Sequence, residues 1–257
     1  MRSLFVVALP RSLSTLVYEA ACTTLDLRSP SWTMDGEILN VDRMAAYGGP
    51  RFEEGAKFTT PDGDPALFQK LTDYLSQVTV AQDFAYKDVV QPFAVAAWSG
   101  LERFRVLRIR RDLAEVAYSV LARGWYYPRV AAPGAHDDLP AAPTAPGPGE
   151  RLITPLIRKE ARSMTGRFIS AVVQGLARAE RALDAIPAVT LDYDDLIWSE
   201  AALTAALRRL YPEEDVQPAR YITEQFCWQR EGILRRRTSP QYQQLQQMVR
   251  HGPDALG

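Results

Sequence analysis

Residues 3–15, SLFVVALPRSLST, are the stretch that decides the fold. Residues 3–9 form a short β-branched and aromatic run of the kind found in strands that are buried on both faces of a parallel sheet. After the segment 10–15, apolar residues recur at helical spacing, at positions 16, 17, 20, 21 and 25. The stretch therefore predicts a strand, a tight loop and a helix, in that order.

Three further strand-to-helix units follow along the chain. The predicted strands lie at 84–90, 105–110 and 188–191, and each precedes apolar residues at helical spacing, the last near 196–210. Pro92 suits the first turn of one helix, and Asp112 suits the N-cap of another. Repeated units of this kind predict an α/β fold, a parallel β-sheet flanked by helices with right-handed crossovers.

The length and the remaining segments favour one domain over residues 1–257. A chain of 257 residues with 47% hydrophobic residues can bury a full core. The apolar spacing over 153–186 predicts one long helix or two helices. The Pro- and Ala-rich segment 127–150 predicts either a surface loop bordering a pocket or a disordered insertion without a role.

The overall composition excludes several classes of partner. A net charge of −1 and a pI near 6.2 argue against nucleic acid or an anionic membrane as the main partner. Cys22 and Cys227 are the two cysteines, and there are two histidines, so neither a zinc cluster nor a disulfide framework is expected. Since no apolar run is long enough for a membrane span or a signal-peptide core, we expect a cytoplasmic protein.

The loop at 10–15 has the features of an anion site. Between a buried strand and a helix, backbone N–H groups and the positive end of the helix dipole face one spot. Arg11 adds forked donors, and Ser12, Ser14 and Thr15 add hydroxyls, so no metal is needed to hold a phosphate or sulfate. The nucleotide-kinase pattern GxxxxGK[ST] is absent here. A purely structural turn that caps the helix is the alternative.

Segment 10–15 resembles the 5′-phosphosulfate loop of sulfotransferases, Pro-Lys/Arg-Ser-Gly-Ser/Thr-Thr, at five of six positions. These enzymes use 3′-phosphoadenosine 5′-phosphosulfate (PAPS) and have a fold similar to P-loop nucleoside-triphosphate hydrolases. The resemblance implies that Arg11, Ser12, Leu13, Ser14 and Thr15 bind the donor. Leu13 departs from the usual glycine, and a left-handed backbone there would cost about 1–2 kcal/mol.

Arg111 and Ser119 form a second match, after the third predicted strand. Eight residues separate them, so a strand-end arginine and a serine two turns into the next helix can converge on one anion. The pair resembles the family's 3′-phosphate motif. The alternative is a surface ion pair between Arg111 and Glu115, with Ser119 incidental.

Two weaker resemblances add further candidates. Tyr193, after the fourth strand, is similar to a family tyrosine near the nucleotide. The basic stretch 230–237 is similar to a late loop that closes over the 3′-phosphate, which implies a role for Arg236 or Arg237. A solvated basic helix end explains that stretch equally well.

Sulfuryl transfer needs positive charge on the developing oxygens and a base for the acceptor. Arg11 and Lys87 are expected to supply the charge. The alternative for Lys87 is a lysine at the end of its strand that turns to solvent. The family's usual histidine, two residues after the strand lysine, is replaced by Val89. We therefore predict Glu37 as the base, with Asp35 and Asp88 as rivals, and a surface carboxylate as the alternative for each.

The resemblance implies a PAPS-dependent sulfotransferase that transfers a sulfuryl group to a hydroxyl or amine of a small-molecule acceptor and releases 3′-phosphoadenosine 5′-phosphate (PAP). The alternatives are a P-loop-like small-molecule kinase and a non-catalytic nucleotide-binding protein. The acceptor and the oligomeric state stay open. An acceptor pocket could be lined by six aromatic residues: Trp32, Phe52, Trp98, Trp125, Tyr126 and Tyr127.

Overall fold

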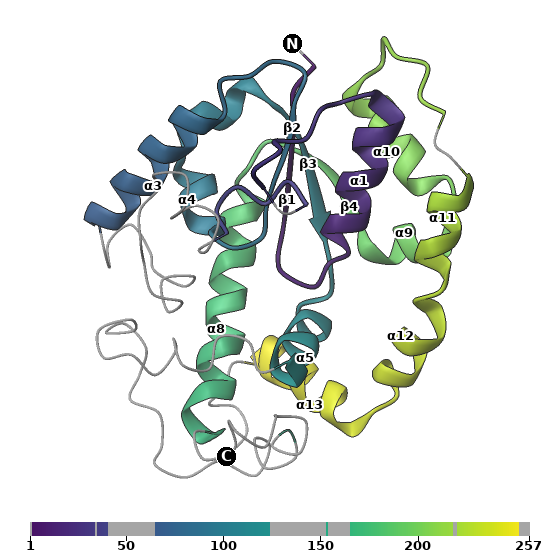
Figure 1. Ribbon diagram of the computed structural model, residues 1–257. Helices are drawn as coiled ribbons and strands as arrows, with labels where there is room; N and C mark the ends of the chain where they lie inside the picture. Colours follow the sequence, from purple (N-terminus) through teal and green to yellow (C-terminus); the bar gives the residue numbers. More distant parts are fainter. Residues whose placement is uncertain are drawn as a thin grey trace.

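A computed structural model describes residues 2–33, 35–40, 65–123, 153, 165–217 and 220–251. Four parallel strands form one sheet in the order β2-β1-β3-β4, with helices on both faces (Figure 1). The strands are β1 (Leu4–Ala8), β2 (Ala85–Asp88), β3 (Arg105–Arg110) and β4 (Val189–Asp192). The prediction of a parallel sheet flanked by helices is confirmed, with strand ends shifted by one or two residues.

The helices are divided between the two faces of the sheet. On one face lie α1 (Ser14–Leu25), α9 (Tyr193–Trp198), α10 (Ala202–Leu210) and α11 (Arg220–Cys227). On the other lie α3 (Pro65–Val78), α4 (Pro92–Ala97) and α8 (Thr165–Asp184), and a 3₁₀ turn η2 (Ser99–Arg103) follows α4. The remaining helices are α5 (Leu113–Arg123), α12 (Arg230–Arg237) and α13 (Pro240–His251).

Strand β1 shows how the sequence builds the two layers. Leu4, Val6 and Ala8 pack into the core beneath α1 and α10, whereas Phe5 and Val7 pack into the core that α3, α4 and α8 cover. All five side chains are buried. Burying each larger side chain contributes about 1.5–3 kcal/mol, so an uncharged strand without alternation is stable only at the centre of such a sheet.

The helix expected near 196–210 is corrected by the structure. It is two helices, α9 and α10, because Ser199 adopts an extended backbone with φ −126° and ψ 119°. Leu196 and Ile197 of α9, and Leu203 and Leu207 of α10, are buried in the same core. The break lets two short helices turn their apolar faces to one layer.

None of the described helices is both long and apolar enough to cross a membrane.

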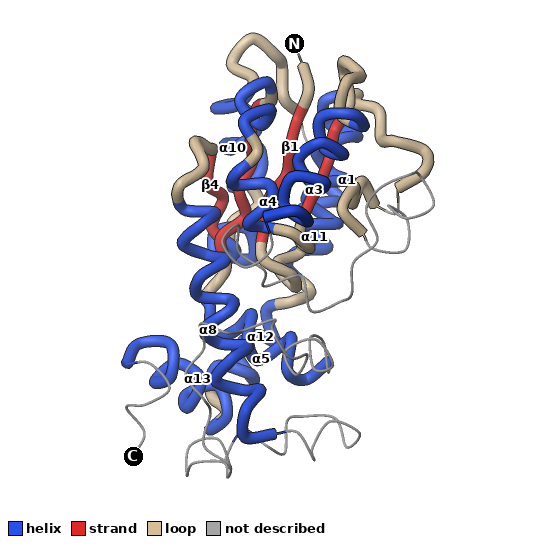
Figure 2. Tube along the Cα trace, turned by 90° about the vertical axis from the view of Figure 1, so that its left-hand side faces the viewer, coloured by secondary structure: helices blue, strands red, loops and turns tan. Residues whose placement is uncertain are grey.

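The carboxyl ends of all four strands lie at one edge of the sheet. Strand β1 has β2 on one side and β3 on the other, so the connections that leave β1 and β2 run in opposite directions across the sheet. Such a switch point is where α/β sheets bind ligands. Figures 1 and 2 show α5, α12 and α13 beyond this edge.

Candidate functional site

The loop after β1 is left-handed at the residue just before α1, although that residue is not glycine. Leu13, the N-cap of α1, is left-handed with φ 59° and ψ 21°, and Arg11 also has a positive φ of 67°. The Leu13 side chain packs against the core under α1, and its carbonyl oxygen accepts a bond from Val17 N at 3.0 Å. These contacts offset the cost of the left-handed backbone, so the strain expected at Leu13 is tolerated.

The two predicted anion motifs meet at the carboxyl edge of the sheet. Arg11 Nε donates to Ser119 Oγ at 3.2 Å, and Arg111 Nη1 donates to the carbonyl oxygen of Arg11. The Arg111 guanidinium also lies 4.1 Å from the centre of the Tyr193 ring. The structure therefore brings together four residues that come from the ends of β1, β3 and β4 and from helix α5.

The alternative of a surface ion pair between Arg111 and Glu115 is wrong. Arg111 Nε does lie 2.9 Å from Glu115 Oε2, but the two side chains are only 4% and 0% exposed. The pair forms where α5 begins, and Asp112 caps this helix by accepting a bond from Glu115 N at 2.9 Å, as predicted. Residues at i and i+4 face the same side of a helix, and here that side turns inward.

The end of helix α12 completes an arginine cluster, which consists of Arg11, Arg111, Arg236 and Arg237. Arg237 donates to Glu115 Oε1 at 2.6 Å and to Asp194 Oδ1 at 2.5 Å. Arg236 Nη1 lies 4.0 Å from Glu115 Oε2, and its guanidinium lies 5.6 Å from the centre of the Tyr118 ring. The basic stretch is therefore more than a solvated helix end, because two of its arginines reach the predicted site.

The electrostatics of this cluster favour a bound anion. The pKa of Arg11 is lowered by burial and then by the nearby positive charges of Arg123, Arg111 and Arg236. Burial and the charge of Arg111 likewise lower the pKa of Arg236. An anion placed among these guanidinium groups would relieve their mutual repulsion.

Three buried polar atoms in the cluster have no hydrogen-bond partner within the described part of the chain: Ser12 Oγ, Arg111 Nη2 and Arg236 Nη1. Leaving such atoms unsatisfied costs about 1–3 kcal/mol each. Buried polar groups in native proteins nearly always find a partner. Unsatisfied groups from three separate elements at one positively charged place could together hold an oxyanion.

Lys87 and Glu37 lie side by side next to the loop. Lys87 is only 2% exposed, and its Nζ donates to Thr15 Oγ1 at 2.7 Å, so the alternative of a lysine turned to solvent is wrong. Glu37 and Lys87 form an isolated parallel β-bridge, with Lys87 N donating to Gly36 O at 2.9 Å. Burial lowers the pKa of Lys87, and the charge of Glu37 opposes that shift.

Gly36 and Tyr18 fix the segment that carries Glu37. Gly36 has a φ of 71°, and a Cβ atom there would lie 2.1 Å from Tyr18 Cζ. Tyr18 is itself held by a bond from its hydroxyl to the carbonyl oxygen of Ala85 in β2 at 2.8 Å. Sequence reasoning missed both residues, and the glycine immediately before Glu37 was the available signal.

The two rival carboxylates occupy different settings. Asp88 is buried, and its oxygens accept bonds from Val90 N at 3.1 Å and Gln91 N at 2.9 Å, which holds the chain before α4. Asp35 is exposed on a left-handed backbone with φ 55°. Glu37 combines partial exposure with backbone pairing to Lys87, and its Oε2 accepts a bond from Asn40 Nδ2 at 3.3 Å.

The expected aromatic pocket is only partly described. Trp98 is buried in the core and donates to Ser76 Oγ at 2.9 Å, so it cannot line an open pocket. Trp32 is half-buried and packs edge-on against Tyr74 with ring centres 6.4 Å apart. The segment 127–150 lies outside the described residues, as do the other four aromatic candidates: Phe52, Trp125, Tyr126 and Tyr127.

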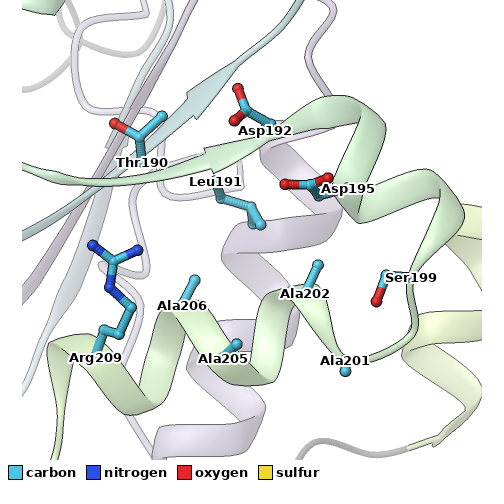
Figure 3. A pocket seen from close by; sticks show the side chains of 10 residues that line it. All are labelled: Thr190, Leu191, Asp192, Asp195, Ser199, Ala201, Ala202, Ala205, Ala206 and Arg209. Atoms are coloured by element: carbon cyan, nitrogen blue, oxygen red, sulfur yellow. The ribbon is translucent and has the colours of Figure 1, made fainter.

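A pocket of about 310 Å³ lies elsewhere, between strand β4 and helices α9 and α10 (Figure 3). Asp192, Asp195 and Arg209 line it together with Thr190, Leu191, Ser199 and four alanines. None of the residues of the arginine cluster is among them. The pocket is therefore separate from the anion site.

Comparisons with protein-family models, with curated proteins and with solved structures gave no match for this chain. The functional interpretation consequently rests on the geometry of the site.

Proposed function

We propose that the protein is a sulfotransferase that moves a sulfuryl group from PAPS to a hydroxyl or amine of a small-molecule acceptor. The observation that carries this proposal is the convergence of the two motifs: Arg11 bonds to Ser119, Arg111 bonds to the Arg11 backbone, and unsatisfied buried donors surround them. Both motifs thus contribute to a single positive site at the switch point of the sheet.

The two halves of the site fit the two anionic groups of PAPS. The loop 10–15, at the N-terminus of α1, offers Arg11, Ser12 and backbone N–H groups to the 5′-phosphosulfate. Arg111, Ser119 and Arg236 offer charge and a hydroxyl to the 3′-phosphate. Tyr193, stacked on Arg111, would lie near the nucleotide. No step of this binding requires a metal.

The transfer itself follows from the same residues. The acceptor oxygen forms a bond to sulfur as the bond between sulfur and the bridging phosphate oxygen breaks, and PAP leaves. Arg11 and Lys87 offset the negative charge that develops on the bridging and sulfuryl oxygens. Glu37, which is paired with Lys87 through the backbone, accepts the proton of the acceptor hydroxyl.

Nucleotide choice tests the proposal. PAP should bind far more tightly than ADP, which lacks the 3′-phosphate, and magnesium should make little difference. Arg236→Ala should weaken PAP binding by about 10–100-fold, the range for losing one charged contact, and leave ADP binding unchanged. Arg235→Ala is the matched control, because Arg235 is exposed and pairs with Glu231 of its own helix.

Calorimetry with the two nucleotides decides between the candidates. Equal affinities, or binding of ADP only with magnesium, would refute the sulfotransferase and favour a kinase. Transfer of labelled sulfate to any acceptor in a screen would exclude a non-catalytic binding protein. Tight binding of PAP with no transfer across a broad set of alcohols, phenols and amines would favour that binding protein instead.

A further inference from the structure

Glu115 lies at the centre of the arginine cluster, although its sequence position suggested only a surface ion pair with Arg111. Its side chain is completely buried in the first turn of α5. Oε1 accepts a bond from Arg237 at 2.6 Å, and Oε2 accepts one from Arg111 at 2.9 Å. Both carboxylate oxygens are thus occupied by guanidinium groups, one from the end of β3 and one from α12.

Arg237 connects three elements with one side chain. Besides Glu115 of α5, it bonds to Asp194 of α9 at 2.5 Å. Its two neighbours on α12 behave differently: Arg235 is exposed and pairs within the helix, while Arg236 lies over Tyr118 and keeps an unsatisfied buried nitrogen. The three successive arginines therefore differ in their surroundings, and of these three Arg237 alone makes close ion pairs with other elements. Arg230 and the buried Ile233 hold the first part of α12, so Arg237 anchors its end.

The net charge of this group is positive, which favours a bound anion. Arg111, Arg236 and Arg237 face two carboxylates, those of Glu115 and Asp194. The group therefore keeps an excess positive charge before Arg11 is added. Removing either member of a buried, hydrogen-bonded pair leaves an uncompensated charge, so the docking of α12 and the charge of Glu115 depend on each other.

We propose that Glu115 is a positioning residue that, through Arg237 and Asp194, docks helix α12 so that Arg236 and Arg111 face the same anion. It touches no substrate. The inference deepens the proposed function, on which it rests for the identity of that anion as the 3′-phosphate of the nucleotide. Because α12 docking creates part of the anion site, binding of the anion must stabilise the docked helix to the same extent.

The test compares wild type with Glu115→Gln, Arg237→Gln and the double variant, and Glu231→Gln is the control for loss of a carboxylate on α12. Each single change should weaken PAP binding by about tenfold or more, since one charged contact is misplaced. The double variant should bind PAP as tightly as the single variant that has the lower PAP affinity, because both changes break the same pair. Amide exchange over 230–237 should be faster in all three and unchanged in the control.

A second arm uses inorganic sulfate as the probe, so that failure of the proposed function can be recognised separately. Saturating sulfate should slow amide exchange over 230–237 in wild type and not in Glu115→Gln. If PAP shows no preference over ADP but sulfate still slows exchange in this way, the proposed function fails and the positioning role stands. PAP affinity within threefold of wild type in both single variants, together with unchanged exchange in α12, would overturn the positioning role.

Glu115→Gln alone could prevent folding, since the side chain is fully buried. Asp194→Asn is therefore the milder variant, because Asp194 is about half exposed and bonds only to Arg237 among the arginines of α12. It should shift PAP affinity and α12 exchange in the same direction by a smaller factor. An effect on stability without any effect on these two measurements would overturn the inference.

Discussion

Leu13→Gly should be more stable than Leu13→Ala, the reverse of the usual order. In a regular helix or strand, alanine is favoured over glycine by about 0.5–1 kcal/mol. At φ 59° and ψ 21°, however, a side chain costs about 1–2 kcal/mol that glycine avoids. Subtracting the extra freedom of glycine in the unfolded chain, about 0.4–1 kcal/mol, leaves glycine ahead by roughly 0.5–1 kcal/mol.

Comparison with wild type separates the side chain from the backbone. Leu13 is half-buried, so Leu13→Ala should lose about 1 kcal/mol of apolar burial and keep the backbone strain. Leu13→Gly should lose the same apolar burial, but relief of the backbone strain should recover most of that lost free energy. Urea unfolding monitored by circular dichroism gives the free energies. As a control, Thr23 is exposed inside α1, where Thr23→Ala should be more stable than Thr23→Gly by about 1 kcal/mol. Finding the alanine variant more stable at both sites would refute the left-handed loop.

Two further changes probe the chemistry beside the loop. Glu37→Gln should keep PAP affinity and lower turnover by about 10²–10⁴-fold, the span for losing a general base, in a labelled-sulfate assay at saturating donor; undiminished turnover would show that the base is another group. Lys87→Met should abolish transfer and stabilise the fold near neutral pH, because burial lowers the pKa of Lys87 and so disfavours its charged form. Between the folded and unfolded pKa values the unfolded chain binds more protons, so wild-type stability rises with pH over that range. The advantage of Lys87→Met should therefore shrink as the pH rises to the unfolded lysine pKa of about 10. Urea midpoints that diverge over this range would contradict the sign of the shift.

The sheet was predictable because its strands are short apolar-rich runs, each followed by apolar residues at helical spacing, and because the central strand β1 carries no charge. Residues 4–9 carry no polar side chain, so burial on both faces was the expected arrangement. The position of Arg111 and Ser119 was also predictable, because the carboxyl ends of parallel strands share one edge. Both inferences use only the local residue pattern, which can be read from a single sequence, and the general right-handedness of strand-to-helix units.

Burial and partner choice could not be predicted from the same sequence. Arg111 and Glu115 are spaced like a surface pair, yet both are buried, because Arg111 bonds to the loop after β1 and Arg237 of α12 covers Glu115. Arg236 and Arg237 are adjacent and chemically identical, yet Glu115 and Asp194, far away in the chain, distinguish them. The break between α9 and α10 likewise depends on the layer that both helices share, which no local signal near Ser199 records.

The partners of Glu115 also determine when during biosynthesis the site can exist. Arg111 lies four residues from Glu115 and emerges from the ribosome with it, whereas Arg237 is made 122 residues later. Domains generally fold as units, and the residues of β1, α1 and α5 are made well before the arginines of α12 that complete the cluster. An anion bound at this place would therefore gain the contacts of α12 only in chains that have been made as far as residue 237, and by mass action it would stabilise those chains most.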